Sequence, residues 1–256
     1  MPHLNRDDVE LYYEVHGDGP ALLLTHGYGS SSHMWAAQLE PFSKHFKLIT
    51  WDMRGHGRTS SPSDVSLYSE PATVADMAAL LDAVDAKTAI VGGLSLGGYM
   101  SLGFHLAYEQ RTRALLIVDT GPGFKNDEAR EGWNVRARTI GDRWESEGLT
   151  RLEKGSIEQR AARHTSAKGL ALAARGMLAQ RDARVINSLT DIHVPALVVV
   201  GANDEPFLKS TDYMAAKIPG AKKAVIPDAG HAANMDQPAI FNDVVLSFLR
   251  EAGLTG

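Results

Sequence analysis

The sequence predicts one α/β domain in which a mostly parallel central sheet is flanked by helices and carries an inserted helical cap. Three observations lead to this prediction. Short apolar runs of strand length alternate with segments of helical periodicity along most of the chain. The one long exception, residues 122–190, contains no convincing strand. A length of 256 residues and a hydrophobic content of 44% suit a single domain with a large core.

The expected elements follow in order from the N-terminus. Apolar and β-branched runs predict strands at residues 9–15, 21–25, 46–51, 89–91, 114–118, 194–200 and 223–227. The turn at 16–20 joins the first two, which we expect to pair as an antiparallel hairpin at a sheet edge. Helical spacing predicts a helix over 74–84, with a capping box between Thr73 and Asp76. A closing helix is expected at 239–252.

A serine flanked by glycines follows one of these strands. Gly93, Ser95 and Gly97 fit the Gly-x-Ser-x-Gly pattern of a nucleophile elbow, a sharp strand-to-helix turn that holds the serine hydroxyl exposed. The flanking residues must be small because the backbone folds tightly against its neighbours. The turn also leaves the N–H of Leu96 at the positive end of the helix, where it can bind a developing negative charge. Ser95 is therefore the predicted nucleophile.

A serine nucleophile needs a histidine to accept its proton and an acid to orient that histidine. Asp204 lies in the turn after the strand at 194–200, and His231 lies in the loop after the strand at 223–227. We expect both turns at the sheet edge that also carries Ser95. The chain order of nucleophile, acid and histidine is typical of one fold among the several that use this triad.

These motifs give the chain a resemblance to the α/β-hydrolase superfamily over nearly its whole length. Five segments carry it in the family's order, namely residues 25–30, 52–59, 93–98, 201–206 and 228–232. Within the superfamily the chain is most similar to small bacterial esterases and lactonases, including the enol-lactone hydrolase type. The resemblance implies the α/β-hydrolase fold and a hydrolase that needs no metal or organic cofactor.

The resemblance also assigns roles to residues near the nucleophile. Tyr28, after the strand at 21–25, would supply the second oxyanion N–H and leave its side chain to line the pocket. His26 is expected to brace the loop rather than to act in catalysis. Asp52 and Arg54 belong to an Asp-x-Arg-Gly-x-Gly turn and are expected to hold a loop beneath the site through a charge-assisted hydrogen bond.

Two alternatives concern the chemistry. Asp119, after the strand at 114–118, is a second candidate for the acid because some members of the fold carry the acid there. Dehalogenases and epoxide hydrolases of this fold have an aspartate at the elbow. Ser95 therefore argues against both activities.

Residues 122–190 are predicted to form the helical cap over the active site, as an insertion within a single domain that spans residues 1–256. The candidate substrate contacts are Tyr28, Trp133, Trp144 and Met177. Each tryptophan has a competing role, which is to pin the cap to the core.

Composition narrows the classes of partner. The net charge of −5 argues against binding nucleic acid through phosphate neutralisation. The ten histidines lack metal-ligand spacing and the chain has no cysteine, so no metal site is predicted. No apolar stretch has the length of a membrane span, and residues 1–10 lack the apolar core of a signal peptide, so the cytoplasm is the default location. Whether the chain forms a homo-oligomer stays open.

The predicted function is hydrolysis of a small-molecule carboxylic ester or lactone through an acyl-enzyme. Ser95 attacks the carbonyl, His231 accepts its proton and Asp204 orients the imidazolium. The N–H groups of Tyr28 and Leu96 hold the oxyanion. The same residues would serve a thioesterase, a C–C bond hydrolase, a perhydrolase or an amidase, because the triad defines the machinery and not the bond. A ligand-sensing receptor on this fold is the alternative outside enzymes.

Overall fold

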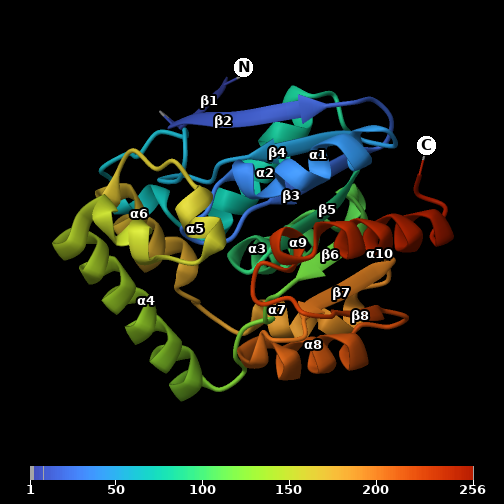
Figure 1. Ribbon diagram of the computed structural model, residues 1–256. Helices are drawn as coiled ribbons and strands as arrows, with labels where there is room; N and C mark the ends of the chain where they lie inside the picture. Colours follow the sequence, from blue (N-terminus) through green and yellow to red (C-terminus); the bar gives the residue numbers. More distant parts are fainter. Residues whose placement is uncertain (1–2, 8, 256) are drawn as a thin grey trace.

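The computed structural model describes residues 3–7 and 9–255, and its strands form one eight-stranded sheet. The strands are β1 (His3–Arg6), β2 (Val9–His16), β3 (Ala21–Thr25), β4 (Lys47–Trp51), β5 (Ala89–Leu94), β6 (Thr112–Val118), β7 (Ala196–Gly201) and β8 (Lys222–Ile226). Their order across the sheet is β1-β2-β4-β3-β5-β6-β7-β8. Neighbours from β4 to β8 are parallel, whereas β2 is antiparallel to both β1 and β4. The predicted mostly parallel sheet is confirmed (Figure 1).

The predicted hairpin between the first two long strands is wrong. β2 pairs with β4, while β3 pairs in parallel with β4 on one side and β5 on the other. All five residues of β3 are buried, as expected for a central strand of a parallel sheet, which is covered on both faces. The unbroken apolar run at 22–24 is the sequence signal of that position. The turn at 16–20 therefore connects strands that are separated by β4.

Helices cover both faces of the sheet. The α-helices of the described residues are α1 (Ala36–Ser43), α2 (Glu70–Ala83), α3 (Leu96–Ala107), α4 (Asp127–Glu147), α5 (Ile157–Ala161), α6 (Ala167–Ala173), α7 (Arg184–Asn187), α8 (Glu205–Lys217), α9 (Ala233–Asp236) and α10 (Pro238–Glu251). α1, α9 and α10 pack on one face, and α2, α3 and α8 pack on the other. No helix within the described residues is long and apolar enough to cross a membrane.

Alternation along the strands divides the apolar core into two layers. Leu22 and Leu24 of β3 belong to the same buried cluster as Phe42 of α1, whereas Leu23 belongs to the cluster that contains Met77 of α2. Successive side chains of a strand point to opposite faces, so an apolar run of three residues supplies both layers. Complete burial of one such side chain contributes about 1.5–3 kcal/mol, which fixes the central strands and the turns at their ends.

Helix α2 begins four residues earlier than the predicted start at Val74. Ser69 is its N-cap, and the Ser69 hydroxyl accepts the N–H of Ala72 (3.2 Å). Thr73 lies inside the helix, where its hydroxyl donates to the carbonyl of Ser69 (2.8 Å). Asp76 is fully buried and faces Arg54. The predicted capping box between Thr73 and Asp76 is therefore wrong.

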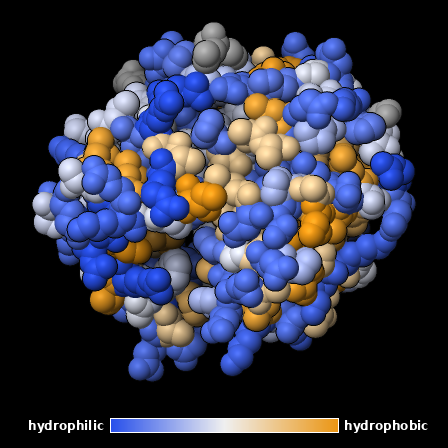
Figure 2. Space-filling view, viewed as in Figure 1, coloured by the Kyte–Doolittle hydropathy of each residue, from blue (hydrophilic) through white to orange (hydrophobic). Residues whose placement is uncertain are grey.

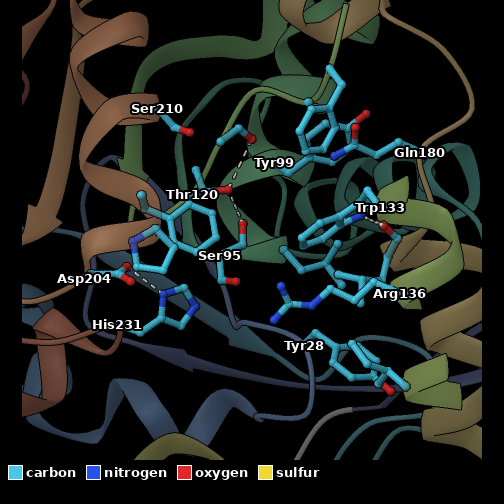
Figure 3. A pocket seen from close by; sticks show the side chains of 18 of the residues that line it. Tyr28, Ser95, Tyr99, Thr120, Trp133, Arg136, Gln180, Asp204, Ser210 and His231 are labelled. Atoms are coloured by element: carbon cyan, nitrogen blue, oxygen red, sulfur yellow. Dashed lines mark hydrogen bonds and ion pairs between the residues drawn. The ribbon is translucent and has the colours of Figure 1, made fainter. Parts of the chain in front are cut away.

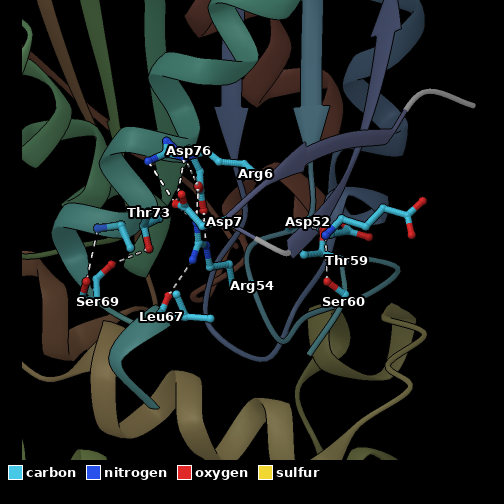
Figure 4. A network of polar contacts seen from close by, with 12 residues as sticks. Arg6, Asp7, Asp52, Arg54, Thr59, Ser60, Leu67, Ser69, Thr73 and Asp76 are labelled. Atoms are coloured by element: carbon cyan, nitrogen blue, oxygen red, sulfur yellow. Dashed lines mark hydrogen bonds and ion pairs between the residues drawn. The ribbon is translucent and has the colours of Figure 1, made fainter. Parts of the chain in front are cut away.

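Asp52 and Arg54 each brace the chain, but with different partners (Figure 4). The guanidinium of Arg54 makes a two-pronged contact with Asp76, with N–O distances of 2.6 and 2.7 Å. The Asp52 carboxylate accepts the backbone N–H groups of Ser32 (2.6 Å) and Arg58 (2.8 Å). Charge-assisted bonds of this kind are the strong class of hydrogen bond. The loop after β4 is thereby fixed from two sides.

The inserted segment, residues 122–190, contains α4 to α7 and no strand among its residues. It follows β6 and precedes β7, and in Figure 1 its long helix α4 lies at the left beside the sheet. Figure 2, drawn from the same side, shows the surface hollowed between this segment and the body of the molecule.

Candidate active site

Ser95 lies in the turn between β5 and α3, and its backbone is strained. Its φ of 56° and ψ of −117° lie outside the regions that a residue with a side chain normally adopts. Its N–H donates to the carbonyl of Val118 at the end of β6 (2.9 Å), and the Thr120 hydroxyl donates to the Ser95 carbonyl (2.7 Å). These bonds hold the turn, and Ser95 lines a cavity (Figure 3).

The glycines beside Ser95 allow two elements to cross closely. A Cβ on Gly97 would lie 2.1 Å from the carbonyl oxygen of Thr25, and a Cβ on Gly93 would lie 2.5 Å from the same atom. Both distances are far shorter than any real contact of a Cβ atom. The start of α3 therefore passes the end of β3 at a separation that only glycine permits, which is the physical basis of the Gly-x-Ser-x-Gly pattern.

His231 and Asp204 meet at the same edge of the sheet. Asp204 follows β7 and immediately precedes α8, and His231 lies in the loop after β8. The two side chains are joined by a hydrogen bond of 2.8 Å between His231 Nδ1 and Asp204 Oδ2. Asp204 is buried, while 32% of the His231 side chain is exposed. The ring of Phe207 stacks on His231 at a centroid distance of 5.0 Å and limits its orientation.

Leu96 and Tyr28, which carry the predicted oxyanion N–H groups, both line the cavity. Leu96 is the first residue of α3, so its N–H has no partner within the helix. Within the described residues, neither this N–H nor that of Tyr28 donates a hydrogen bond. Tyr28 lines the cavity, and its hydroxyl donates to the carbonyl of Leu170 in the inserted segment (2.7 Å).

One cavity of about 520 Å³ brings these residues together. Ser95, Leu96, Asp204, His231 and Tyr28 all line it. The inserted segment contributes Phe124, Trp133, Arg136, Ile140, Leu178 and Gln180. Tyr99, Phe207 and Ser210 add further lining from α3 and α8. The volume and the largely apolar lining with a few polar groups are typical of small-molecule sites.

Two predicted substrate contacts lie away from the cavity. Trp144 is 1% exposed and packs in a small cluster with Leu170 and Ala171, and Met177 is 1% exposed within the main core. Neither residue lines the cavity, so we withdraw both as substrate contacts. Trp144 follows Trp133 on α4 by three helical turns, which is about 16 Å along the axis. That distance takes Trp144 beyond the cavity.

Arg136 is one of several cavity residues that the sequence did not predict, and it is the one that carries a positive charge. It lies three residues after Trp133 and four before Ile140, a spacing that puts the three side chains on one face of α4. The sequence therefore held a usable signal, because a helix face that includes a tryptophan at the cavity also includes this arginine. Knowing that the face turns toward the cavity required the structure.

Asp119, the alternative acid, is buried next to the pair but bonds elsewhere. Its Oδ1 accepts the N–H of Gly201 at the end of β7 (2.7 Å). Burial and the neighbouring Asp204 carboxylate hold the pKa of Asp119 well above its ordinary value, although the bond from Gly201 acts in the opposite direction. Of the two acids, Asp204 is the one that is hydrogen-bonded to His231 among the described residues.

His26 joins two loops and does not line the cavity. Its Nδ1 lies 2.7 Å from the carbonyl of Gly27, and its Nε2 accepts the N–H of Met53 (2.9 Å). This pattern requires a neutral imidazole with its proton on Nδ1. The arrangement agrees with the expected bracing role.

His26 belongs to a row of three histidines that reaches the inserted segment, of which His26 and His56 are buried and His164 is half-buried. Ring centroids of His26 and His56 lie 5.0 Å apart, and those of His56 and His164 lie 5.7 Å apart. His164 accepts the N–H of Gly57 at Nδ1 and contacts the carbonyl of Gly29 at Nε2, both at 2.9 Å. His164 thereby ties the inserted segment to two loops of the body.

The histidine row predicts that the fold loses stability in mild acid. Burial lowers the pKa of all three rings, that of His26 to about 4, with Asp52 opposing the effect on His26. An unfolded histidine titrates near 6.5, so between that pH and the lower folded values the unfolded state binds more protons. Stability is therefore complete above about pH 6.5 and falls below it, by up to about 1.4 kcal/mol per pH unit for each histidine.

Urea unfolding at pH 7.5 and pH 5 measures this loss. The matched variant is His164→Gln, whose amide can accept from Gly57 and donate to Gly29 but does not titrate. We expect a shallower acid slope for His164→Gln than for the unaltered chain. Equal slopes for the two proteins would contradict the assignment to His164.

Comparisons with known proteins agree with this fold. The model of the alpha/beta hydrolase family matches residues 22–244. A RutD protein of Azorhizobium caulinodans, provisionally named a carbamate hydrolase, is 30% identical over 98% of this chain and 99% of its own. The 3-oxoadipate enol-lactonase 2 of Acinetobacter baylyi is 28% identical over 96% of each chain. The solved structure of a thermophilic esterase from Thermogutta terrifontis has a TM-score of 0.81 and 28% identity, with 95% of this chain and 94% of that chain covered.

Proposed function

This chain belongs to the alpha/beta hydrolase family, and on that premise we propose that it cleaves a small carboxylic ester or lactone through an acyl-enzyme formed on Ser95. One observation carries the proposal. Ser95 and His231 line the same cavity. Asp204 is hydrogen-bonded to Nδ1 of His231 (2.8 Å), which leaves Nε2 for the proposed reaction. The proposed reaction uses no metal and no organic cofactor.

In the proposed mechanism, Asp204 accepts a hydrogen bond from the Nδ1–H of His231, which leaves Nε2 as the base. Nε2 takes the hydroxyl proton as Ser95 Oγ attacks the carbonyl carbon. The N–H groups of Tyr28 and Leu96 then donate to the oxyanion. Collapse of this intermediate expels the alcohol, which receives the proton from His231. Water repeats the same steps on the acyl-enzyme and releases the acid.

The similarity to a lactonase and to an esterase supports the choice of an ester or lactone bond. A cavity of about 520 Å³ suits a small or medium substrate. Carbamate hydrolysis is the second candidate, favoured by the 30% identity to the RutD protein. It would use the same residues, because the triad does not define the leaving group.

A substrate panel tests the proposal. It contains esters and lactones of graded acyl length together with carbamates of matching shape, and product is measured against the amount of enzyme. We expect many turnovers on at least one ester or lactone. Faster turnover of the carbamates would favour the second candidate, and a single slow cleavage per molecule would instead indicate a receptor.

We further propose that the inserted segment acts as a cap that selects substrates, through Trp133. Its indole N–H donates to the carbonyl of Leu178 (2.8 Å), which fixes the ring at the cavity. Trp133→Ala should lower kcat/KM for the longer acyl chains by about three- to tenfold relative to the short ones, because apolar contact area is lost. Rates across the same panel measure this change.

Trp144→Ala is the matched control on the same helix. Because Trp144 is buried away from the cavity, the variant should lose about 3–5 kcal/mol of stability and keep the wild-type ranking of substrates. An unchanged ranking in Trp133→Ala would remove Trp133 from the proposed specificity surface.

A further inference from the structure

Arg136 is the one lysine or arginine among the described residues that line the cavity. Figure 3 shows its guanidinium extending from the side of α4 toward Ser95 and His231. Within the described part of the chain, it makes no hydrogen bond and no ion pair. Its one recorded contact is with Trp133, whose ring centroid lies 5.8 Å from the guanidinium carbon. The cavity lining therefore contains a guanidinium that is not paired with a carboxylate of the described residues.

The acids around Arg136 are already engaged. Of the two acidic residues in the cavity lining, Asp204 is bonded to His231, and Glu158 accepts the hydroxyl of Ser156. Elsewhere on α4, Arg138 is paired with Glu131. Arg136 thus differs from Arg138 in having a cavity, rather than a protein carboxylate, in front of it.

The exposed guanidinium of Arg136 has one aromatic neighbour at the cavity. Trp133 is fixed by its bond to the carbonyl of Leu178, and Arg136 lies on the same helix face one turn further on. Contact between a guanidinium and an aromatic face is attractive, so Trp133 favours a guanidinium at the cavity wall.

The inserted segment is basic although the whole chain is acidic. Residues 122–190 carry 13 Lys and Arg against nine Asp and Glu, a net charge of +4. The rest of the chain carries 13 against 22, a net charge of −9. Charge separated in this way attracts anions to the side of the cavity that the segment forms.

We propose that the substrate carries a carboxylate remote from the bond that is cleaved, and that Arg136 binds this carboxylate. The planar fork of a guanidinium matches the two oxygens of a carboxylate, which gives both attraction and a fixed orientation. Arg136 would then place the reacting carbonyl over Ser95 by holding the other end of the molecule. This inference rests on the proposed function, because it names the substrate class of the same site.

The test compares two series of methyl esters of graded length. One series consists of monomethyl esters of dicarboxylic acids, and the other has the free carboxylate replaced by a carboxamide of the same shape. For each carboxylate ester and the carboxamide ester of the same length, the ratio of their kcat/KM values measures the effect of the carboxylate charge. Both esters pass through the same chemical step. We expect the unaltered protein to prefer the carboxylate ester by about tenfold or more at the best length.

Arg136→Met should abolish this preference, whereas Arg138→Met, on the opposite side of the same helix, should keep it. Arg136→Glu should reverse it. Equal rates for the two series in the unaltered protein, or a preference that survives in Arg136→Met, would overturn the inference while leaving ester hydrolysis intact.

Binding of the same esters to Ser95→Ala, measured by calorimetry, separates the inference from the proposed chemistry. The carboxylate ester should bind more tightly than the carboxamide, and a second change, Arg136→Met, should remove the difference. If the unaltered protein cleaves neither these series nor any ester or lactone of the panel, the proposed function fails, and this binding difference still decides the role of Arg136. Equal binding of the two esters would refute it.

Discussion

Ser95→Ala should lower ester hydrolysis by about 10⁴ to 10⁶-fold and leave the fold nearly unchanged. The loss is large because the proposed mechanism has no other nucleophile at the elbow. The fold should persist because the two bonds that hold the turn, to Val118 and from Thr120, use the backbone of residue 95 and not its side chain. Initial rates on the best ester and the melting temperature measure the two effects.

Ser210 provides the matched control, because it also lines the cavity but lies within helix α8. Ser210→Ala should keep most of the activity. A sulfonyl fluoride or an organophosphate should add its mass to the peptide that contains Ser95 and to no other. Retention of a tenth of the activity by Ser95→Ala would refute the acyl-enzyme mechanism.

Asp204→Asn should lower kcat by about 10³ to 10⁴-fold. An amide at this position no longer stabilises the imidazolium, and it can hold His231 with the proton on the wrong nitrogen. The expected loss arises at the 2.8 Å contact between His231 and Asp204. It should therefore appear mainly in kcat and hardly in the melting temperature.

Asp119→Asn is the informative counterpart, with an expected loss of less than about tenfold. The raised pKa of Asp119 favours its neutral carboxyl form, which asparagine resembles in shape and charge. The side-chain oxygen that accepts the N–H of Gly201 is kept. If Asp119→Asn lost more activity than Asp204→Asn, the acid would have to be reassigned.

The central strands could be predicted from the sequence because their burial on both faces requires unbroken apolar runs, as in β3 and β7. Pairing could not be predicted as well. A short turn after residue 15 is compatible with a hairpin, and the insertion of β4 between β2 and β3 depends on contacts distant in sequence. The start of α2 could not be predicted for a related reason. Asp76 bonds to Arg54, which is distant in sequence, and it does not cap the helix.

The candidate site also has one part that could be predicted from the sequence and one part that could not. Ser95, Asp204 and His231 could be predicted to converge because each follows a strand of one parallel sheet, and such strands end at the same edge. The residues that form the cavity walls could not be predicted, because they depend on how α4 packs against the rest of the molecule. Helical spacing alone does not distinguish Trp133, which lines the cavity, from Trp144, which lies three turns beyond it.

Tyr28 belongs to both parts of the molecule. Its backbone N–H is a proposed oxyanion donor, while its hydroxyl is bonded to the carbonyl of Leu170 in the inserted segment. The two parts are therefore not independent modules that evolution or an engineer can exchange freely. A grafted segment of different shape must still present an acceptor at the place of residue 170, or the loop that carries Tyr28 loses a support. A backbone carbonyl meets this need with any amino acid, so this constraint falls on the position of α6 and not on the side chain of residue 170.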